Sequence, residues 1–199
     1  MLPYELRGAR SVICARLSQP HLCLDRETAG HSLRVAAYAV ELARTMGFES
    51  DSVKAIEWGA LLHDIGKIAV PDSILRKAAP LTPEEWLILR QHPVWGYALL
   101  AGESSLPAAS QEIVYSHHEW WDGLGYPQGL AGEEIPLGAR LFAVVDTYDA
   151  ITSDRAYRRA RSHRQALAEL EQAAGTQLDP QIVAAFCRLS AVDPRRFAP

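Results

Sequence analysis

The sequence is poor in features that mark several classes of protein. Its 199 residues include three cysteines, Cys14, Cys23 and Cys187, with no C-x-x-C pair, so neither a disulfide framework nor a zinc ribbon is indicated. No apolar run reaches the roughly 18 residues that span a bilayer, and the first twenty residues lack the continuous apolar stretch of a signal peptide. We therefore expect a cytoplasmic, soluble protein that does not contact a membrane.

The chain also lacks an excess of positive charge. Its formal net charge of -4 argues against binding to a DNA or RNA polymer, because such proteins usually carry a strongly basic domain. A small anionic substrate remains compatible, since it needs only a local group of cations or metals. With 48% hydrophobic residues, the chain is long enough to bury one sizeable core.

No stretch alternates polar and apolar residues over a convincing length, so we expect an all-α fold. In the long segment 25–46, for example, Val35, Ala39, Leu42 and Met46 recur at helical spacing, and Gly47 provides a stop. Thr82-Pro83-Glu84-Glu85 has the composition of a capping box at a helix start. The predicted helices are 5–17, 25–46, 52–63, 82–92, 94–100, 108–121, 138–151, 162–174 and 180–189, with a helical turn near 74–75.

Histidines and carboxylates gather at the ends or on the apolar faces of these predicted helices. His63-Asp64 follows an apolar run and precedes Gly66 and Lys67, where a buried helix gives way to a looser segment. The same arrangement recurs where His117-His118 follows an apolar helix. The full set of candidate metal ligands is Glu27, His31, His63, Asp64, His92, His117, His118 and Asp146.

This donor set predicts transition metals. Mixed imidazole and carboxylate ligands favour iron, manganese, zinc or nickel over calcium or magnesium, and the lack of cysteine ligands argues against structural zinc. Eight ligands exceed the needs of one ion, so two or three metals are expected. Two nearby metals can share a bridging hydroxide that attacks a phosphodiester, and Asp64 suits the bridging position because both of its oxygens can bind.

Other residues point to substrate contacts around these ligands. Lys67 follows at the edge of the cluster, and the segment 122–129 has three glycines and a proline in eight residues, which predicts a loop with Tyr126 at its centre. Arg155 and Arg158 lie one to three turns after the aspartates of the helix 138–151, where they could hold phosphates.

Taken together, these motifs resemble the HD-GYP family. The resemblance spans about residues 25 to 187 and rests on Glu27-Thr28-x-x-His31-x-x-Arg34-Val35, His63-Asp64-Ile65-Gly66-Lys67, Gln91-His92-Pro93, His117-His118-Glu119-x-x-Asp122-Gly123-x-Gly125-Tyr126-Pro127 and Asp146-x-x-Asp149-Ala150-Ile151-Thr152-Ser153-Asp154-Arg155-x-Tyr157-Arg158. It implies an HD-domain helical bundle with a polynuclear metal site in its core. It also implies hydrolysis of cyclic di-GMP to pGpG, and often on to GMP.

The resemblance further implies a role for each candidate. One metal would be held by His31, His63, Asp64 and Asp146, the second by Asp64, His92, His117 and His118, and a third through Glu27. Iron or manganese is expected first, with zinc or nickel as alternatives. Asp64 and Lys67 would be catalytic, with Lys67 on the scissile phosphate, Tyr126 on a guanine, and Arg155 and Arg158 on the other phosphate.

The sequence departs from the family pattern at few positions, and two other functions remain open. Trp120 stands where the family often has a basic residue. Residues 1–24 are expected to form an N-terminal helix or linker ahead of the domain 25–199. They are too few for the receiver or sensor domain of many members, so regulation is expected from outside or from a removed segment.

One alternative function is that of a phosphohydrolase acting on another nucleotide. The other is that of a catalytically weak cyclic di-GMP sensor, or of a module that docks on a diguanylate cyclase (GGDEF) domain through the loop at Gly125-Tyr126-Pro127, the Gly-Tyr-Pro loop.

Overall fold

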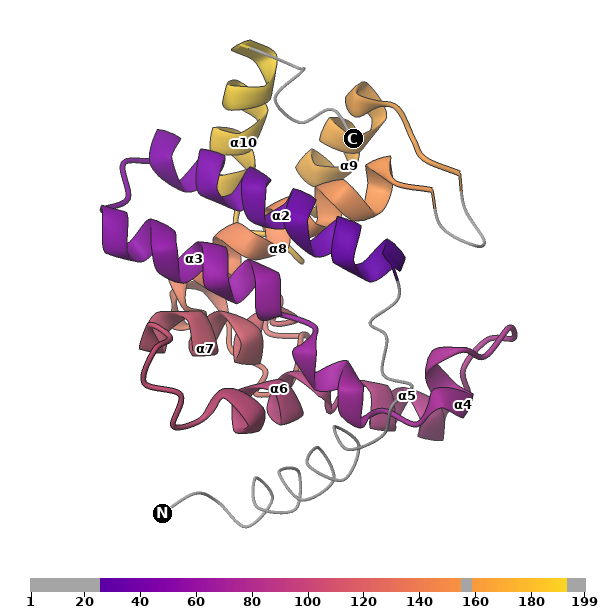
Figure 1. Ribbon diagram of the computed structural model, residues 1–199. Coiled ribbons are helices and arrows are strands. Elements are labelled where there is room, and N and C mark those ends of the chain that lie inside the picture. Colours follow the sequence, from indigo (N-terminus) through magenta and orange to yellow (C-terminus); the bar gives the residue numbers. More distant parts are fainter. Residues whose placement is uncertain (1–25, 155–158, 193–199) are drawn as a thin grey trace.

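The computed structural model describes residues 26–154 and 159–192, and side chains within 30–154 and 159–191 (Figure 1). The predicted helix 5–17, and with it the proposed linker 1–24, lies outside this range. The described elements are α2 (Arg26–Thr45), α3 (Ser50–Leu62), η1 (Ile65–Ala69), α4 (Asp72–Leu75), α5 (Pro83–Leu89), α6 (His92–Leu100), α7 (Ala108–Ser116), η2 (Gly132–Glu134), α8 (Leu137–Thr152), α9 (His163–Ala173) and α10 (Pro180–Val192). Because these residues form helices and no strand, the predicted all-α class is confirmed.

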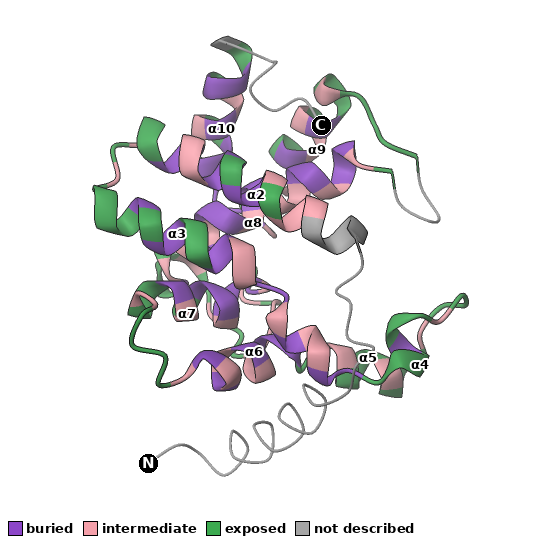
Figure 2. Ribbon diagram, in the orientation of Figure 1, coloured by how far each residue is buried: buried purple, intermediate pink, exposed green. Residues whose placement is uncertain are grey.

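Helix α8 lies at the centre of the bundle. It contacts α2, α3, α7, α9 and α10, and its Phe142 and Tyr148 side chains are almost fully buried. Leu42 of α2 and Phe186 of α10 belong to the same apolar cluster. Figure 2 shows the buried faces of these helices turned toward one another, whereas α4 and α5 are largely exposed. Burial of this central cluster therefore fixes α8 against the helices that carry the candidate ligands.

The helix signals read from the sequence are confirmed at two ends. Helix α2 stops before Gly47, whose φ of +81° is a left-handed conformation that favours glycine, and the Gly47 amide donates to the Arg44 carbonyl at 3.1 Å. Helix α5 begins with the expected capping box. The Glu85 amide donates to the Thr82 hydroxyl at 3.3 Å, and the Thr82 amide donates to the Glu85 carboxylate at 2.7 Å.

Two predicted helix boundaries next to candidate ligands are wrong, and the last helix runs to Val192 instead of ending at residue 189. The predicted helix 108–121 ends at Ser116, because the amides of Trp121 and Asp122 donate to the carbonyls of Gln177 and Thr176 in a distant loop instead of continuing the helix. The predicted helix 82–92 ends at Leu89, and His92 begins the next helix. Both differences place a histidine at a break between elements.

The 3₁₀ turn η1 crosses helix α6 at unusually close range. A Cβ atom added to Gly66 would lie 1.9 Å from the His92 carbonyl oxygen and 2.4 Å from the Gly96 nitrogen. Both contacts are with backbone atoms, which cannot move aside as a flexible side chain could. Glycine at position 66 therefore allows the segment that follows His63-Asp64 to lie directly against the start of α6, where His92 is located.

Candidate metal centre

Six of the sequence-predicted ligands form two compact groups. His31 of α2, His63 at the end of α3 and Asp146 of α8 form the first group, which we call the His-Asp cluster. The second, which we call the histidine cluster, consists of His92, His117 and His118. Within each group the potential ligand atoms lie within 4.8 Å of one another. Helices distant in sequence thus bring these side chains together as predicted.

Asp64 lies between the two clusters. Its Oδ2 atom is 3.2 Å from His63 Nε2, and its Oδ1 atom is 3.4 Å from His92 Nε2. One carboxylate oxygen therefore faces each group. The side chain is only 11% exposed, so a carboxylate at this position needs cationic neighbours. The geometry suits the bridging role predicted for Asp64.

Three of the histidines are held by the same kind of hydrogen bond. The Nδ1 atom donates to the backbone carbonyl three residues earlier, at 2.8 Å from Ala60 for His63, from Leu89 for His92 and from Val114 for His117. A carbonyl can only accept, so Nδ1 must carry the proton in each ring. The Nε2 atoms are then the ones left to face the centre, as metal-ligating histidines require.

His31 is oriented by acidic partners instead. Its Nδ1 atom lies 2.7 Å from Asp149 Oδ2, and its Nε2 atom lies 3.2 Å from Asp146 Oδ1. Burial alone would lower the pKa of His31, but the hydrogen bonds to Asp146 and Asp149 and their charges outweigh burial and raise it to about 9. Against the effect of burial, the hydrogen bonds from His31 and Arg34 lower the pKa of Asp149 to about 2. The raised pKa of His31 shows that Asp146 and Asp149 together favour positive charge at this ring.

The histidine cluster has the opposite electrostatics. Burial lowers the pKa of His92 to about 4 and that of His118 to about 3, and it also lowers the pKa of His117. These imidazoles are therefore neutral near pH 7. The Nε2 atoms of His92 and His117 lie 3.1 Å apart, and since both Nδ1 atoms carry protons, two lone pairs face each other. A cation between them would relieve this repulsion, so the residues present fit metal ions.

The remaining predicted residues are placed as follows. Lys67 donates to Asp64 Oδ2 at 2.6 Å and its side chain is 36% exposed, so it lies at the edge of the cluster as expected. Tyr126 stacks on the His118 ring with centroids 4.7 Å apart, and the guanidinium of Arg90 lies 5.2 Å from the centroid of the Tyr126 ring.

Three predicted residues cannot be placed in the site. Glu27 lies in α2 one turn before His31, but its side chain lies outside the described part of the structure. Arg155 and Arg158 lie wholly outside it.

The structure also identifies supporting residues that the sequence analysis did not select. Asp149 is 1% exposed and accepts two hydrogen bonds from Arg34, at 2.7 and 3.0 Å, besides contacting His31. Glu119 is 3% exposed and accepts from the amides of Gln128 and Leu130 at 2.7 and 3.0 Å, which holds the Gly-Tyr-Pro loop. The sequence held one signal for each residue. Asp149 follows Asp146 by one helical turn, and Glu119 comes directly after two histidines.

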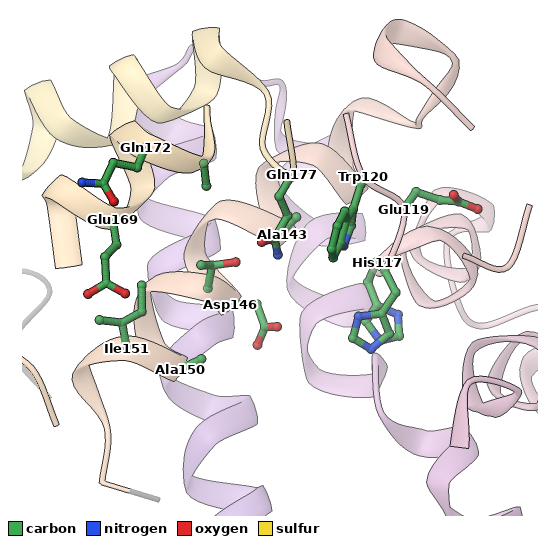
Figure 3. A pocket seen from close by; sticks show the side chains of 13 residues that line it. His117, Glu119, Trp120, Ala143, Asp146, Ala150, Ile151, Glu169, Gln172 and Gln177 are labelled. Atoms are coloured by element: carbon green, nitrogen blue, oxygen red, sulfur yellow. The ribbon is translucent and has the colours of Figure 1, made fainter. Parts of the chain in front are cut away.

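A cavity of about 640 Å³ opens beside the ligands. His117, His118 and Asp146 line it together with Trp120, while residues of α8, α9 and the loop after α9 complete its walls. In Figure 3, His117 and Trp120 lie on one side and Glu169 and Gln172 of α9 on the other, with Asp146 between them. The volume falls in the ~300–1,000 Å³ range of small-molecule pockets. The candidate centre is therefore reachable by a ligand of nucleotide size.

Comparison with known proteins places this arrangement in a family. The family model described as HD domain matches residues 16–182. The chain belongs to the HD domain family. The predicted resemblance to its HD-GYP members is confirmed by curated relatives. HD-domain phosphohydrolases use divalent metals, and the two clusters are candidate groups for holding them.

Two curated relatives come from Vibrio cholerae. A cyclic di-GMP phosphodiesterase is 40% identical over 92% of this chain and 40% of its own length. A 3'3'-cGAMP-specific phosphodiesterase 2 is 35% identical over 92% of this chain and 35% of its own length. The chain thus spans less than half of the length of these relatives.

A solved structure shares the fold. The HDG"Y"P protein from Bdellovibrio bacteriovorus superimposes with a TM-score of 0.67 at 18% identity, covering 94% of this chain and 63% of that one. This likeness confirms the HD-domain helical bundle. Within the described residues, no helix has the length and apolar character to cross a membrane.

Proposed function

We propose that this chain is a metal-dependent phosphodiesterase that hydrolyses cyclic di-GMP to pGpG, with residues 25–199 as the catalytic domain. The observation that carries the proposal is the joining of two ligand clusters by Asp64 beside a nucleotide-sized cavity. The names of the relatives support a cyclic dinucleotide as the substrate class.

Two metal ions, iron or manganese first and zinc or nickel as alternatives, would supply Lewis acidity and a water activated for attack on phosphorus. His31, His63 and Asp146 would hold one ion, and the neutral imidazoles of His92, His117 and His118 the other. Asp64 would contribute one oxygen to each. Glu27 would add a third ion, as the resemblance suggests.

Lys67 would neutralise charge on the reacting phosphate. Its ammonium group lies against Asp64 and is partly exposed, so a phosphate at the bridged centre would be within its reach. Positioned cations of this kind stabilise the charge that develops on a transferring phosphoryl group. Arg155 and Arg158 would hold the other phosphate, and Tyr126, next to His118, would contact a guanine.

The test is turnover of cyclic di-GMP by protein purified without oxygen and loaded with iron or manganese. We expect pGpG to appear, and Asp64→Asn, which keeps the shape of the side chain but removes its charge, to abolish turnover. Asp51→Asn, an exposed acid in the first turn of α3, is the matched control and should keep full activity. Absence of turnover with iron, manganese, zinc and nickel would favour the sensor function instead.

A docking role for the Gly-Tyr-Pro loop is a second proposal about the same region. Leu124 at the loop tip is 76% exposed, whereas Glu119 fixes the loop backbone from inside, so the loop offers a rigid apolar contact. A GGDEF domain is the partner that the resemblance suggests. Leu124→Ser should weaken co-purification with such a domain and leave metal content unchanged. Equal binding of the domain by the wild-type protein and by the Leu124→Ser variant would contradict the docking role.

A further inference from the structure

The cavity beside the metal ligands continues past them toward α9. Its far part is lined by Trp120 on one side and by Glu169, Gln172 and Gln177 on the others (Figure 3). Small side chains from α8 and α9, including Ala143 and Ala173, leave the space between them open. None of these wall residues belongs to the ligand clusters, so their side chains are available for contacts with a bound molecule rather than for holding metal.

Trp120 presents an aromatic surface to this space. The side chain is 38% exposed, and no contact between its ring and another ring or a cation occurs among the described residues. The neighbouring Trp121 differs, because the guanidinium of Arg140 lies 5.7 Å from its ring centroid. Aromatic faces that remain open in a ligand cavity are suited to stacking on a flat base.

The opposite wall offers hydrogen-bonding groups. Within the described residues, the side-chain amides of Gln172 and Gln177 have no hydrogen-bond partner, although both line the cavity. Glu169 is paired with Arg161, whose guanidinium holds one carboxylate oxygen. A carboxylate accepts but does not donate, and it has lone pairs left for further donors. The wall thus combines a pure acceptor with two amides that both donate and accept.

We propose that this part of the cavity is a guanine subsite, in which Trp120 stacks on the base and Glu169 accepts hydrogen bonds from its edge. Guanine presents two adjacent N–H donors, N1–H and the N2 amino group, on its Watson–Crick edge. Adenine presents the N1 acceptor there, which a carboxylate would repel. This inference rests on the proposed function and makes Glu169 a residue that discriminates between purines in the substrate.

The first test compares a nucleotide with a diester that has no base. For Trp120→Ala, we expect the KM for cyclic di-GMP to rise by about 5- to 150-fold, which corresponds to ~1–3 kcal/mol of base stacking. The loss on bis(p-nitrophenyl) phosphate should be at least several-fold smaller, because its nitrophenyl rings are smaller than a purine and have no N–H donors for Glu169. Trp120→Phe should restore most of the nucleotide affinity. Trp58→Ala, which removes a tryptophan of the same 38% exposure from α3, should leave both substrates unaffected.

The second test addresses the choice of base. Glu169→Gln should lower the ratio of kcat/KM for cyclic di-GMP to that for 3'3'-cGAMP by about tenfold, because each good bidentate contact is worth ~1–3 kcal/mol of discrimination. An unchanged ratio would overturn the role of Glu169. For Trp120→Ala, an equal loss on cyclic di-GMP and on bis(p-nitrophenyl) phosphate would overturn stacking. So would a Trp120→Phe variant that does not restore the affinity for cyclic di-GMP.

The two proposals fail in different ways. If the wild-type protein binds cyclic di-GMP without hydrolysing it, the proposed function is wrong, and the subsite is then tested by the dissociation constants of the same variants. If the wild-type protein hydrolyses cyclic di-GMP and Trp120→Ala retains its KM, the function stands and the subsite is overturned.

Discussion

Replacing Gly66 by alanine should separate η1 from α6 and open the metal centre. The added Cβ would meet the His92 carbonyl oxygen at 1.9 Å and the Gly96 nitrogen at 2.4 Å. Overpacking usually lowers the free energy of unfolding by ~1–3 kcal/mol. Both atoms that the added Cβ would meet belong to the backbone, so we expect a loss at the upper end of this range. At ~2–4 °C per kcal/mol for a chain of this length, we expect Tm to fall by roughly 6–12 °C.

Activity should fall by more than this loss of stability explains. The clash lies at His92 itself, a member of the histidine cluster. Its Nε2 atom is 3.4 Å from Oδ1 of Asp64, which lies between the two clusters. A displacement of ~1 Å in a reacting centre can cost about a hundredfold in rate. We therefore expect kcat/KM for cyclic di-GMP to fall by about that factor in protein that is still folded at the assay temperature, together with loss of metal measured by mass spectrometry.

Gly30→Ala is the matched control. Among the described side chains, a Cβ at Gly30 would meet only Arg34 Nη1, at an ordinary 3.5 Å. Gly30 lies inside α2, where alanine is favoured over glycine by ~0.5–1 kcal/mol. Its Tm should stay the same or rise slightly, with full metal content. A Gly66→Ala protein that melts within about 2 °C of wild type and retains its metals would refute the claim that this crossing fixes the centre.

Three further perturbations test the surroundings of the centre. Asp149→Asn removes the negative charge and one of the two acceptor oxygens that hold His31 and Arg34. It should weaken metal binding by ~10–100-fold in competition with a chelating dye; unchanged affinity would contradict the role of Asp149 in orienting His31. Glu119→Ala leaves the amides of Gln128 and Leu130 without their acceptor, so the loop should exchange hydrogen faster by an amount equivalent to ~1.5–3 kcal/mol, and equal protection would count against it. Removing metal with a chelator should lower Tm by roughly 8–16 °C if the ions were bound at about a thousand times their Kd; an unaltered Tm would show that the ions do not stabilise the fold.

The two adjacent ligand pairs could be predicted because their signal is local. His63-Asp64 and His117-His118 each follow an apolar helical run, and polar ligands directly after such a run are hard to explain as surface residues. The structure keeps both pairs in the candidate centre. The predicted end of the helix 108–121 was wrong for a non-local reason. The hydrogen bond from the Trp121 amide to the Gln177 carbonyl joins segments that are far apart in the sequence, and local helix propensity cannot reveal it.

Asp149 was missed for a similar reason. In sequence it resembles a second buried acid one turn after Asp146, and nothing local shows what it contacts. Its partners His31 and Arg34 lie more than a hundred positions earlier, and they meet it only because α2 packs on α8. The open face of Trp120 likewise depends on α9 and the loop before α10, which form the other walls of the cavity.

The three histidines held by carbonyls share a physical cause that links the fold to the site. Ala60, Leu89 and Val114 all lie in the last turn of a helix, where backbone carbonyls lose their intrahelical partners. A histidine three residues further on supplies the missing donor through Nδ1, and this leaves Nε2 pointing away from the helix. The carboxyl ends of α3, α5 and α7 also carry partial negative charge, which favours cations nearby. The ends of these helices therefore set the tautomer of these three ligands and add a negative potential that favours a cation at the centre.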